Sequence, residues 1–321
     1  MLFEELDKKD RKILYALDVD ARQSLSAIGK QVGLRPESVA NRIEKLEREN
    51  VIRGYYAVIN NMQMGYLNFR VYLQFFDSSS EIRNRIVQYL IAEPRVSLVA
   101  ETESVFDLAV GIWVKSVPEF DQIWKAFLSR FREFVHGEKI CLFTRVRHFR
   151  RAYLTGLKTD ETKEEALGSG KQVSVDTLDL QILKELSENA RIPLKELSEK
   201  TKTPPRTVAF RIRRLEKEKV IQGYHVLLNF EALGILYFKV NVELKSMQKL
   251  DEMIAYCHAN PFITYVDETI GGWDLEFDIE VPSKKAFFET MEQLQRAFPE
   301  VRHYEYFGFK RYNKLLYLPQ A

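Results

Sequence analysis

The stretch Asp10-Arg11-Lys12-Ile13-Leu14 returns as Asp179-Leu180-Gln181-Ile182-Leu183, and Val51-Ile52-Arg53-Gly54-Tyr55 returns as Val220-Ile221-Gln222-Gly223-Tyr224. Both pairs are separated by 169 residues without a gap, and 21 of the 54 positions from 7 to 60 are identical to their partners. Chance would give about one identity in sixteen at an ordinary composition. The 321-residue chain therefore contains a duplication, and we expect two similar copies of one architecture.

The first 60 residues of each copy have helical periodicity. Apolar residues at i, i+4 and i+7 predict a third helix in both copies: Val39, Ile43 and Leu46, then Val208, Ile212 and Leu215. Pro36 and Pro205 stand at its start, where proline is favoured. Two shorter helical patterns precede it, and a β-like segment with Gly54-Tyr55 as a hairpin or wing follows. This order is typical of a winged helix-turn-helix.

The second half of each copy changes to strand patterns. In the first copy we predict strands near 69–75, 96–102, 106–114 and 139–147, with helices near 83–90 and 120–127. The second copy repeats this βαββαβ order, which gives a ferredoxin-like antiparallel sheet with helices on one face. The bare face needs cover, usually a second such sheet. The predicted fold class is α+β, with two copies of a winged helix-turn-helix followed by a ferredoxin-like domain.

The domain boundaries follow from these patterns. Residues 155–174 are polar, lack aromatic side chains and contain Gly168-Ser169-Gly170, a composition typical of a linker. We predict winged helix-turn-helix domains at 1–60 and 175–229, ferredoxin-like domains at 61–154 and 230–321, and a linker at 155–174.

Composition excludes several classes of protein. Lysine and arginine total 48 against 46 acidic residues, so the net charge of +2 excludes a uniformly basic nucleic-acid coat. Two cysteines exclude a disulfide framework. No run approaches the roughly 18 to 20 apolar residues that span a bilayer, and the first residues carry no apolar signal core. We therefore expect a cytoplasmic protein without a membrane partner.

The motifs of the helical half resemble the leucine-responsive regulator family, Lrp/AsnC. The resemblance is carried by residues 6–14, 20–24, 39–47 and 51–55 and by their second-copy partners. It implies a transcription regulator whose winged domain binds double-stranded DNA. It also implies a ferredoxin-like (RAM-type) domain that dimerises and senses amino acids or similar small molecules. Family members usually have one copy, so the tandem form predicts an internal pseudo-dimer, with further association into a homo-oligomer left open.

The third helix of the second copy is the strongest candidate for DNA contact. Residues 202–219 contain seven basic and two acidic side chains, whereas residues 33–50 contain four of each. A solvated helix face is the alternative, but Arg213 and Lys217 would repel each other at i,i+4 spacing. Basic side chains can bind phosphates and read guanine edges. The candidate DNA-binding residues are Ser38, Asn41, Arg42, Lys45, Arg206, Thr207, Arg211, Arg213 and Arg214; the matched Arg42 and Arg211 are the preferred phosphate contacts.

The turn Gly271-Gly272-Trp273-Asp274 resembles the family's Gly-x-aromatic-Asp turn, which lies near its effector site. The resemblance makes Gly271, Gly272 and Asp274 candidate effector-binding residues, because glycines allow a ligand close to the backbone. A plain tight hairpin is the alternative. The first copy has Ser104-Val105-Phe106-Asp107 and lacks the glycines, so a ligand site is less expected there.

Other polar clusters point to no catalytic chemistry. A basic stretch, Arg145 to Arg151, predicts a solvated edge strand, with a second DNA contact as the alternative. The five histidines and two cysteines lack metal-ligand spacing, and no phosphate loop, nucleophile elbow or zincin motif occurs. We predict no catalytic residue, no metal and no cofactor.

Three functions remain. The first is a sequence-specific, effector-responsive DNA-binding transcription regulator that is not an enzyme. The second is an enzyme like the sirohaem decarboxylases, which share this architecture and bind a tetrapyrrole; it would need histidine, tyrosine and arginine converging on a pocket, and sequence spacing shows no such cluster. The third is a sensor or partner protein with one helix-turn-helix that does not read DNA.

Overall fold

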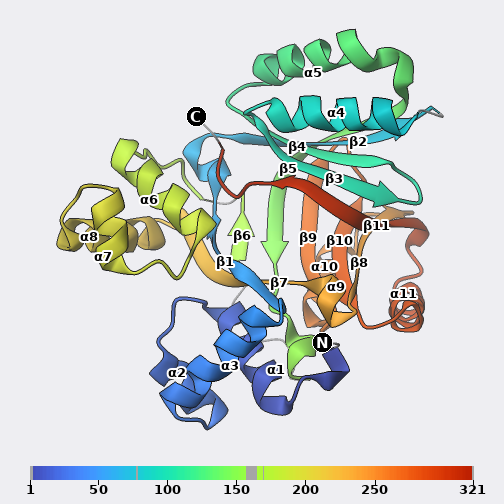
Figure 1. The fold of residues 1–321 in the computed structure, drawn as a ribbon. Helices are drawn as coiled ribbons and strands as arrows, with labels where there is room; N and C mark the ends of the chain where they lie inside the picture. The colour runs from blue at the N-terminus through green and yellow to red at the C-terminus, as the bar shows by residue number, and fades with distance from the viewer. Residues whose placement is uncertain (1–2, 77–78, 157–164, 169, 320–321) are drawn as a thin grey trace.

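The computed structural model describes residues 3–76, 79–156, 165–168 and 170–319 (Figure 1). The first winged helix contains α1 (Lys8–Val19), α2 (Leu25–Val32), α3 (Pro36–Arg48) and strand β1 (Ile52–Ile59). The second contains α6 (Thr177–Glu188), α7 (Leu194–Lys200), α8 (Pro205–Lys217) and β7 (Ile221–Leu228). The predicted third helices are confirmed, and their apolar stripes are buried in one core that both winged helices share.

Each first helix begins at an aspartate whose side chain accepts backbone hydrogen bonds. Asp7 accepts from the N–H groups of Lys9 and Asp10, and Asp176 forms a capping box with Asp179. These contacts satisfy donors that a helix start leaves unpaired. The same local chemistry therefore starts both copies.

The turn before the third helix keeps its backbone shape in both copies. Gly33 ends α2 in the left-handed region at φ +67°, and Lys202 occupies the matched position at φ +50°. A lysine in this region is strained relative to glycine. The second copy thus retains the geometry without the residue that favours it.

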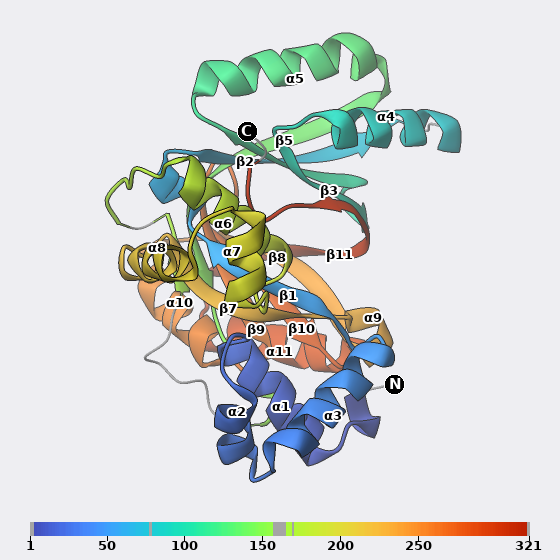
Figure 2. The ribbon, with the colours of Figure 1, turned by 60° about the vertical axis from the view of Figure 1, so that its left-hand side comes forward.

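The wing is the main departure from the predicted fold. Gly54 and Tyr55 form no hairpin, because they lie inside β1, which pairs antiparallel with β7 of the other copy. The N–H of Ala21 donates to Tyr224 O at 2.8 Å, and the N–H of Ala190 donates to Tyr55 O at 2.9 Å. These reciprocal bonds give the two winged helices a pseudo-two-fold relation, and both views show β1 and β7 between the two helix groups (Figures 1 and 2).

The ferredoxin-like halves join into a closed ring of eight strands. The first half supplies β2 (Leu67–Phe75), β3 (Val96–Glu103), β4 (Leu108–Val114) and β5 (Val135–His148). The second supplies β8 (Leu236–Leu244), β9 (Ile263–Ile270), β10 (Leu275–Val281) and β11 (Val301–Leu315). The order β2-β4-β3-β11-β8-β10-β9-β5 closes because β2 also pairs with β5. The pairings β3–β11 and β5–β9 join the two copies. The sheet face that carries no helices in each copy therefore faces the other copy's sheet across the ring, as predicted.

Helices cover the outside of this ring. The first half carries α4 (Ser80–Ala92) and α5 (Val117–Phe131), and the second carries α10 (Leu250–Ala259) and α11 (Lys284–Ala297), each pair over its own sheet and apolar core. Short elements connect the parts: η1 (Phe3–Glu5), η2 (Asn61–Met64), η3 (Arg132–Phe134), η4 (Ala152–Leu154) and α9 (Phe230–Leu233).

The predicted linker at 155–174 lies partly outside the described residues, at 157–164 and 169. Within it, Glu165–Leu167 form the short strand β6, which pairs antiparallel with the end of β5. Through β6, the described part of the linker is thus tied to the sheet. The predicted domain boundaries at 60 and 229 fall directly after β1 and β7.

Candidate nucleic-acid interface and buried charge network

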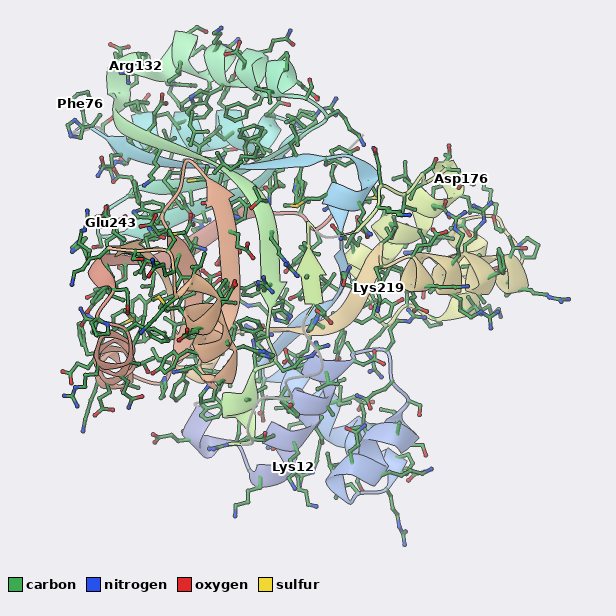
Figure 3. All side chains as sticks on the ribbon, turned by 180° about the vertical axis from the view of Figure 1, so that it is seen from behind. Lys12, Phe76, Arg132, Asp176, Lys219 and Glu243 are labelled. Atoms are coloured by element: carbon green, nitrogen blue, oxygen red, sulfur yellow. The ribbon has the colours of Figure 1, made fainter. Side chains whose placement is uncertain are left out.

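The outer face of α8 carries an exposed basic stripe around one aromatic ring. Arg206, Phe210, Arg213 and Lys217 are exposed at i, i+4, i+7 and i+11, opposite the buried stripe of the helix. Phe210 is 61% exposed. Lys219, labelled in Figure 3, follows the helix and adds another exposed basic side chain. Such a face can approach a phosphate backbone along its length.

The matched face of α3 has a different charge. Its exposed residues at the same four positions are Glu37, Asn41, Glu44 and Arg48. The α8 stripe has three positive charges, whereas the α3 stripe has two negative charges and one positive. The candidate contacts Ser38, Asn41 and Lys45 are exposed on α3, and Arg206, Thr207 and Arg213 are exposed on α8.

The preferred phosphate contacts are held in ion pairs within each winged helix. Arg42 Nη1 donates to Asp7 Oδ2 and Asp10 Oδ1, both at 2.6 Å. Arg211 Nη1 donates to Asp176 Oδ2 at 2.7 Å, and Arg214 pairs with the fully buried Asp179. The Asp179 N–H and the Arg211 guanidinium lower the pKa of Asp176. These arginines fasten the third helix to the start of the first helix, and their contact with phosphate stays a prediction.

The basic stretch from Arg145 to Arg151 is not the predicted solvated edge. Arg147 pairs with Glu268 at 3.0 Å, and His148, Arg150 and Arg151 are buried. Both interpretations of this stretch, a solvated edge and a second DNA contact, are wrong for those three residues. They lie where the end of β5, β6, β7 and α1 meet, so their charges are neutralised inside the protein.

Arg151 joins the first winged helix to the second sheet. Its Nη1 donates to Asp18 Oδ1 of α1 at 2.6 Å, and its Nε donates to Glu280 Oε2 of β10 at 2.9 Å. Tyr153 Oη donates to the same Glu280 oxygen at 2.5 Å. Burial opposes the charge of Asp18, but Arg151 and His225 hold its pKa well below the usual range. Removing one member would leave an unpaired buried charge, which is strongly destabilising.

Two histidines share one carboxylate beside this pair. His225 Nε2 lies 2.6 Å and His148 Nδ1 lies 3.3 Å from Glu165 Oε2. Burial lowers the pKa of His148 to about 4. Burial acts in the same direction on His225, but Glu165 and Asp18 outweigh it and raise the pKa of His225. The two rings therefore favour different protonation states.

His148, Glu165 and His225 also form the one potential metal-ligand group among the described residues, with ligand atoms within 4.8 Å of one another. Arg150 Nη2 donates to Glu165 Oε1 at 2.7 Å, and Arg150 Nη1 lies 3.1 Å from His225 Nε2. A guanidinium thus already occupies the side from which a cation would bind. The group fits an ion-paired network better than a metal site.

Tyrosine rings pack beside the two histidines, a convergence that the spacing of residues in the sequence does not indicate. The Tyr265 ring centre is 4.5 Å from that of His148, and Tyr56 stacks on Tyr317 at 4.1 Å. Tyr56 and His225 face each other across the β1–β7 pair at matched positions of the two copies. Histidine, tyrosine and arginine side chains from segments far apart in the sequence therefore do meet. Several of them are at inward-facing positions of predicted strands, and this position is the sequence signal that could have identified them.

A second buried polar cluster lies inside the ring. Lys239 pairs with Asp267 and lies 3.2 Å from Asp278 and 3.8 Å from Glu276. Burial raises the pKa of Asp267 to about 6, although Lys239 acts in the opposite direction. The inside of the ring thus holds charged groups on the second-copy strands, beside a separate apolar and aromatic cluster that includes Tyr72, Cys141 and Phe307.

The candidate effector turn is packed against its own chain. A Cβ at Gly271, which has φ +83°, would lie 2.7 Å from Ile140 O, and one at Gly272 would collide with Thr269 and Glu276. Asp274 Oδ2 accepts the Leu244 N–H at 2.7 Å, as Asp107 accepts the Phe75 N–H at 2.8 Å in the first copy. The hairpin alone requires these glycines, and effector contact by Gly271, Gly272 and Asp274 stays a prediction.

Comparison with known proteins places the chain in a family. Residues 6–47 match the AsnC-type helix-turn-helix domain, and residues 175–222 match a winged helix-turn-helix DNA-binding domain. An HTH-type transcriptional regulator of Pyrococcus abyssi is 32% identical over 121 residues, 37% of this chain and 78% of the relative. The chain belongs to the Lrp/AsnC family. The transcriptional regulator FL11 of Pyrococcus furiosus is 31% identical over 118 residues, 36% of this chain and 76% of FL11.

The fold extends over both copies in a solved structure as well. The sirohaem decarboxylase NirDL superposes with a TM-score of 0.65 and 14% identity, covering 96% of this chain and 92% of that chain. At this identity the likeness concerns the fold alone. It agrees with the α+β prediction for a tandem Lrp/AsnC chain. No helix of the described residues is long and apolar enough to cross a membrane.

Proposed function

We propose that this Lrp/AsnC-family protein is a sequence-specific DNA-binding transcription regulator that binds an asymmetric site mainly through α8. The supporting observation is the exposed stripe of Arg206, Phe210, Arg213 and Lys217 on a helix-turn-helix. The β1–β7 pair holds this helix in a fixed relation to its duplicate. On this proposal the protein acts by binding and not by catalysis.

The second contact surface is α3, whose acidic side chains limit its use of phosphates. Glu37 and Glu44 would repel the backbone, while Ser38 and Asn41 remain exposed for base edges. The preferred operator is therefore an imperfect palindrome whose half-sites contribute unequally. In the limiting case α3 does not read DNA, which is the sensor or partner alternative for the first winged helix.

Genomic binding-site mapping followed by footprinting of the strongest site tests the proposal. We expect protection of two half-sites, with substitutions in one half-site weakening binding more than the same changes in the other. Gel shifts at low salt with the protein's own upstream region provide a first target. Absence of binding anywhere in the genome would end this proposal.

Effector response belongs to the same proposal, because the family senses amino acids or similar molecules. A thermal-shift screen of amino acids, repeated with Asp274→Asn, tests the turn at residues 271–274. A shift that Asp274→Asn removes, with the unliganded midpoint preserved, supports an effector site there. Gel filtration with light scattering tests whether the internal pseudo-dimer associates further.

We keep a tetrapyrrole enzyme as a second candidate because His148, Arg150, Arg151 and Tyr265 converge in the buried network. These residue types are part of what a sirohaem-decarboxylase-like site would need, the other part being a pocket onto which they converge. Titration with sirohaem discriminates: saturable binding with a shifted visible band, lost in His148→Gln, favours the enzyme. Unchanged free-sirohaem spectra in the presence of protein exclude it.

A further inference from the structure

We propose that a cavity of about 380 Å³ beside the second ferredoxin-like domain binds a small uncharged aromatic molecule that carries one hydrogen-bond donor. The cavity lies at the end of β10, against η1 and η4, and Figure 1 shows the N-terminus at the same end of the second-copy strands. Its volume is within the range of small-molecule pockets. Its apolar walls include Phe3, Ile235, Pro261, Phe262, Val281 and Pro282.

The polar groups at the cavity select against an anion. Glu280 is a wall residue whose oxygens already accept from Arg151, Thr264 and Tyr153. The Tyr153 hydroxyl group donates its hydrogen bond to Glu280, so the hydroxyl oxygen can only accept a hydrogen bond from a ligand. A ligand carboxylate would approach the Glu280 charge without gaining a donor from these two side chains. An aromatic ring with an N–H or O–H fits the same surface.

This cavity is separate from the turn at residues 271–274. That turn precedes β10, whereas Glu280, Val281 and Pro282 are at the other end of the strand. A seven-residue strand spans about 20 Å, so the two places are distinct. The amino-acid-like ligand expected at the turn and the ligand of this cavity also differ in charge.

The duplicated copy shows that the fold itself does not require the cavity. The copies match at an offset of 169 through β2 and β8, and at an offset of 167 from β3 and β9 onward. At these matched positions the first copy has Tyr66 for Ile235, Arg95 for Phe262 and Lys115 for Pro282. Lys115 Nζ lies 3.6 Å from the Tyr66 ring centre and donates to Met64 O at 2.5 Å. Long side chains therefore occupy this place in the first copy. In the second copy, shorter apolar side chains leave space.

The cavity walls come from two parts of the chain: the start of the first winged helix, the DNA-binding domain of the family, and the second ferredoxin-like domain, the sensing domain of the family. Phe3 lies just before α1, and Tyr153 lies two residues after Arg151, which binds Asp18 of α1 and Glu280 of β10. A bound ligand would therefore contact the first winged helix and the second sheet together. Coupling of this site to DNA binding rests on the proposed function, but ligand binding itself does not, so the two can fail separately.

The test uses the full chain and indole, whose planar ring carries one N–H, in isothermal titration calorimetry. We expect saturable binding of one indole per chain, and at least tenfold weaker binding of indole-3-acetate. Ile235→Tyr and Pro282→Lys, which introduce the first-copy residues, should each weaken indole binding at least tenfold. Tyr66→Phe, which keeps the first-copy place filled, is the matched control and should bind as the wild type does.

Circular dichroism and thermal midpoints confirm that each variant is folded. If one variant fails to fold, the other and the indole-3-acetate comparison still decide. No saturable indole binding would overturn the proposal. It would equally be overturned by binding that persists in both variants, or by indole-3-acetate binding as well as indole.

Discussion

The two winged helices are nearly the same inside and different outside. Inside, the buried stripes of α3 and α8 match residue for residue, and Arg42 and Arg211 bind matched aspartates at the start of the first helix. Outside, Glu37 and Glu44 face solvent where the second copy has Arg206 and Arg213. Packing and caps limit what the inner positions accept, whereas the solvent-facing positions are free to diverge. The difference predicts unequal roles in binding DNA.

The largest expected effect comes from neutralising the α8 stripe. Arg206→Ala, Arg213→Ala and Lys217→Ala together should weaken DNA binding about a hundredfold at low salt and reduce the slope of log K against log salt by about 3, roughly 0.9 per phosphate contact. Titrations by fluorescence anisotropy at several salt concentrations measure both quantities.

The matched variant on α3 is the control for that comparison. Glu37→Ala, Glu44→Ala and Arg48→Ala remove two negative charges and one positive charge from the face. Binding should strengthen slightly or stay unchanged, with little change in salt slope. Equal losses from the α3 and α8 variants would show that the two faces contact DNA alike and would contradict the proposed asymmetry.

Acid sensitivity is expected of the buried network in which His148 of β5 and His225 of β7 share Glu165. His148, beside His225, has its pKa lowered to about 4 by burial, so between pH 6.5 and 4 the unfolded chain binds a proton that the folded chain does not. Stability contributed by neutral His148 is therefore present above pH 6.5 and lost as the pH falls toward 4, by up to about 3 kcal/mol. The raised pKa of His225 acts in the opposite direction above pH 6.5.

Urea unfolding between pH 7 and 4 measures this dependence. His148→Gln should flatten the curve, while His303→Gln, at an exposed position, should leave it parallel to the wild type. An equally steep curve in His148→Gln would assign the acid sensitivity to the carboxylates Asp18 and Glu165 instead.

Periodicity and caps identified much of this fold from sequence, because both depend on neighbours along the chain. The third helices begin at Pro36 and Pro205 as predicted. The pairing of β1 with β7 was missed, since a strand has the same alternation whether its partner is its own hairpin or the other copy. Arg150 and Arg151 looked like a solvated run because the partners Asp18, Glu165 and Glu280 are distant in sequence.

The inner ion pairs should affect stability more in the second copy. Arg211→Ala with Arg214→Ala removes both arginines from the buried Asp179 and should lower the free energy of unfolding, because the carboxylate is left buried without its partners. The matched pair Arg42→Ala with Lys45→Ala should lower it less, because Lys45 lies near Glu49 and not on Asp10. Urea unfolding measures both. If the second-copy variant keeps its stability but loses salt-dependent DNA binding, these arginines are phosphate contacts.

The smallest predicted effect concerns the one matched pair of uncharged side chains on the two exposed stripes, Asn41 and Phe210. An exposed phenylalanine on a helix that enters the major groove can contact a thymine methyl group, whereas asparagine can bind adenine through two hydrogen bonds. Phe210→Ala should weaken binding about fourfold, because one methyl-sized apolar contact contributes about 0.8 kcal/mol. Replacing each thymine of the α8 half-site by uracil should reproduce this loss at one position.

Phe210→Ala and the uracil substitution remove the same contact only if their losses of binding free energy do not add. Phe210→Ala should therefore be insensitive to the uracil substitution that weakens the wild type, while Asn41→Ala should remain fully sensitive to it. Anisotropy titrations of the four protein–DNA combinations measure this coupling for Phe210. If the losses add, Phe210 does not contact that methyl group, and the proposed thymine contact is wrong. In that case the difference in charge between the two exposed stripes is left as the basis of their unequal roles.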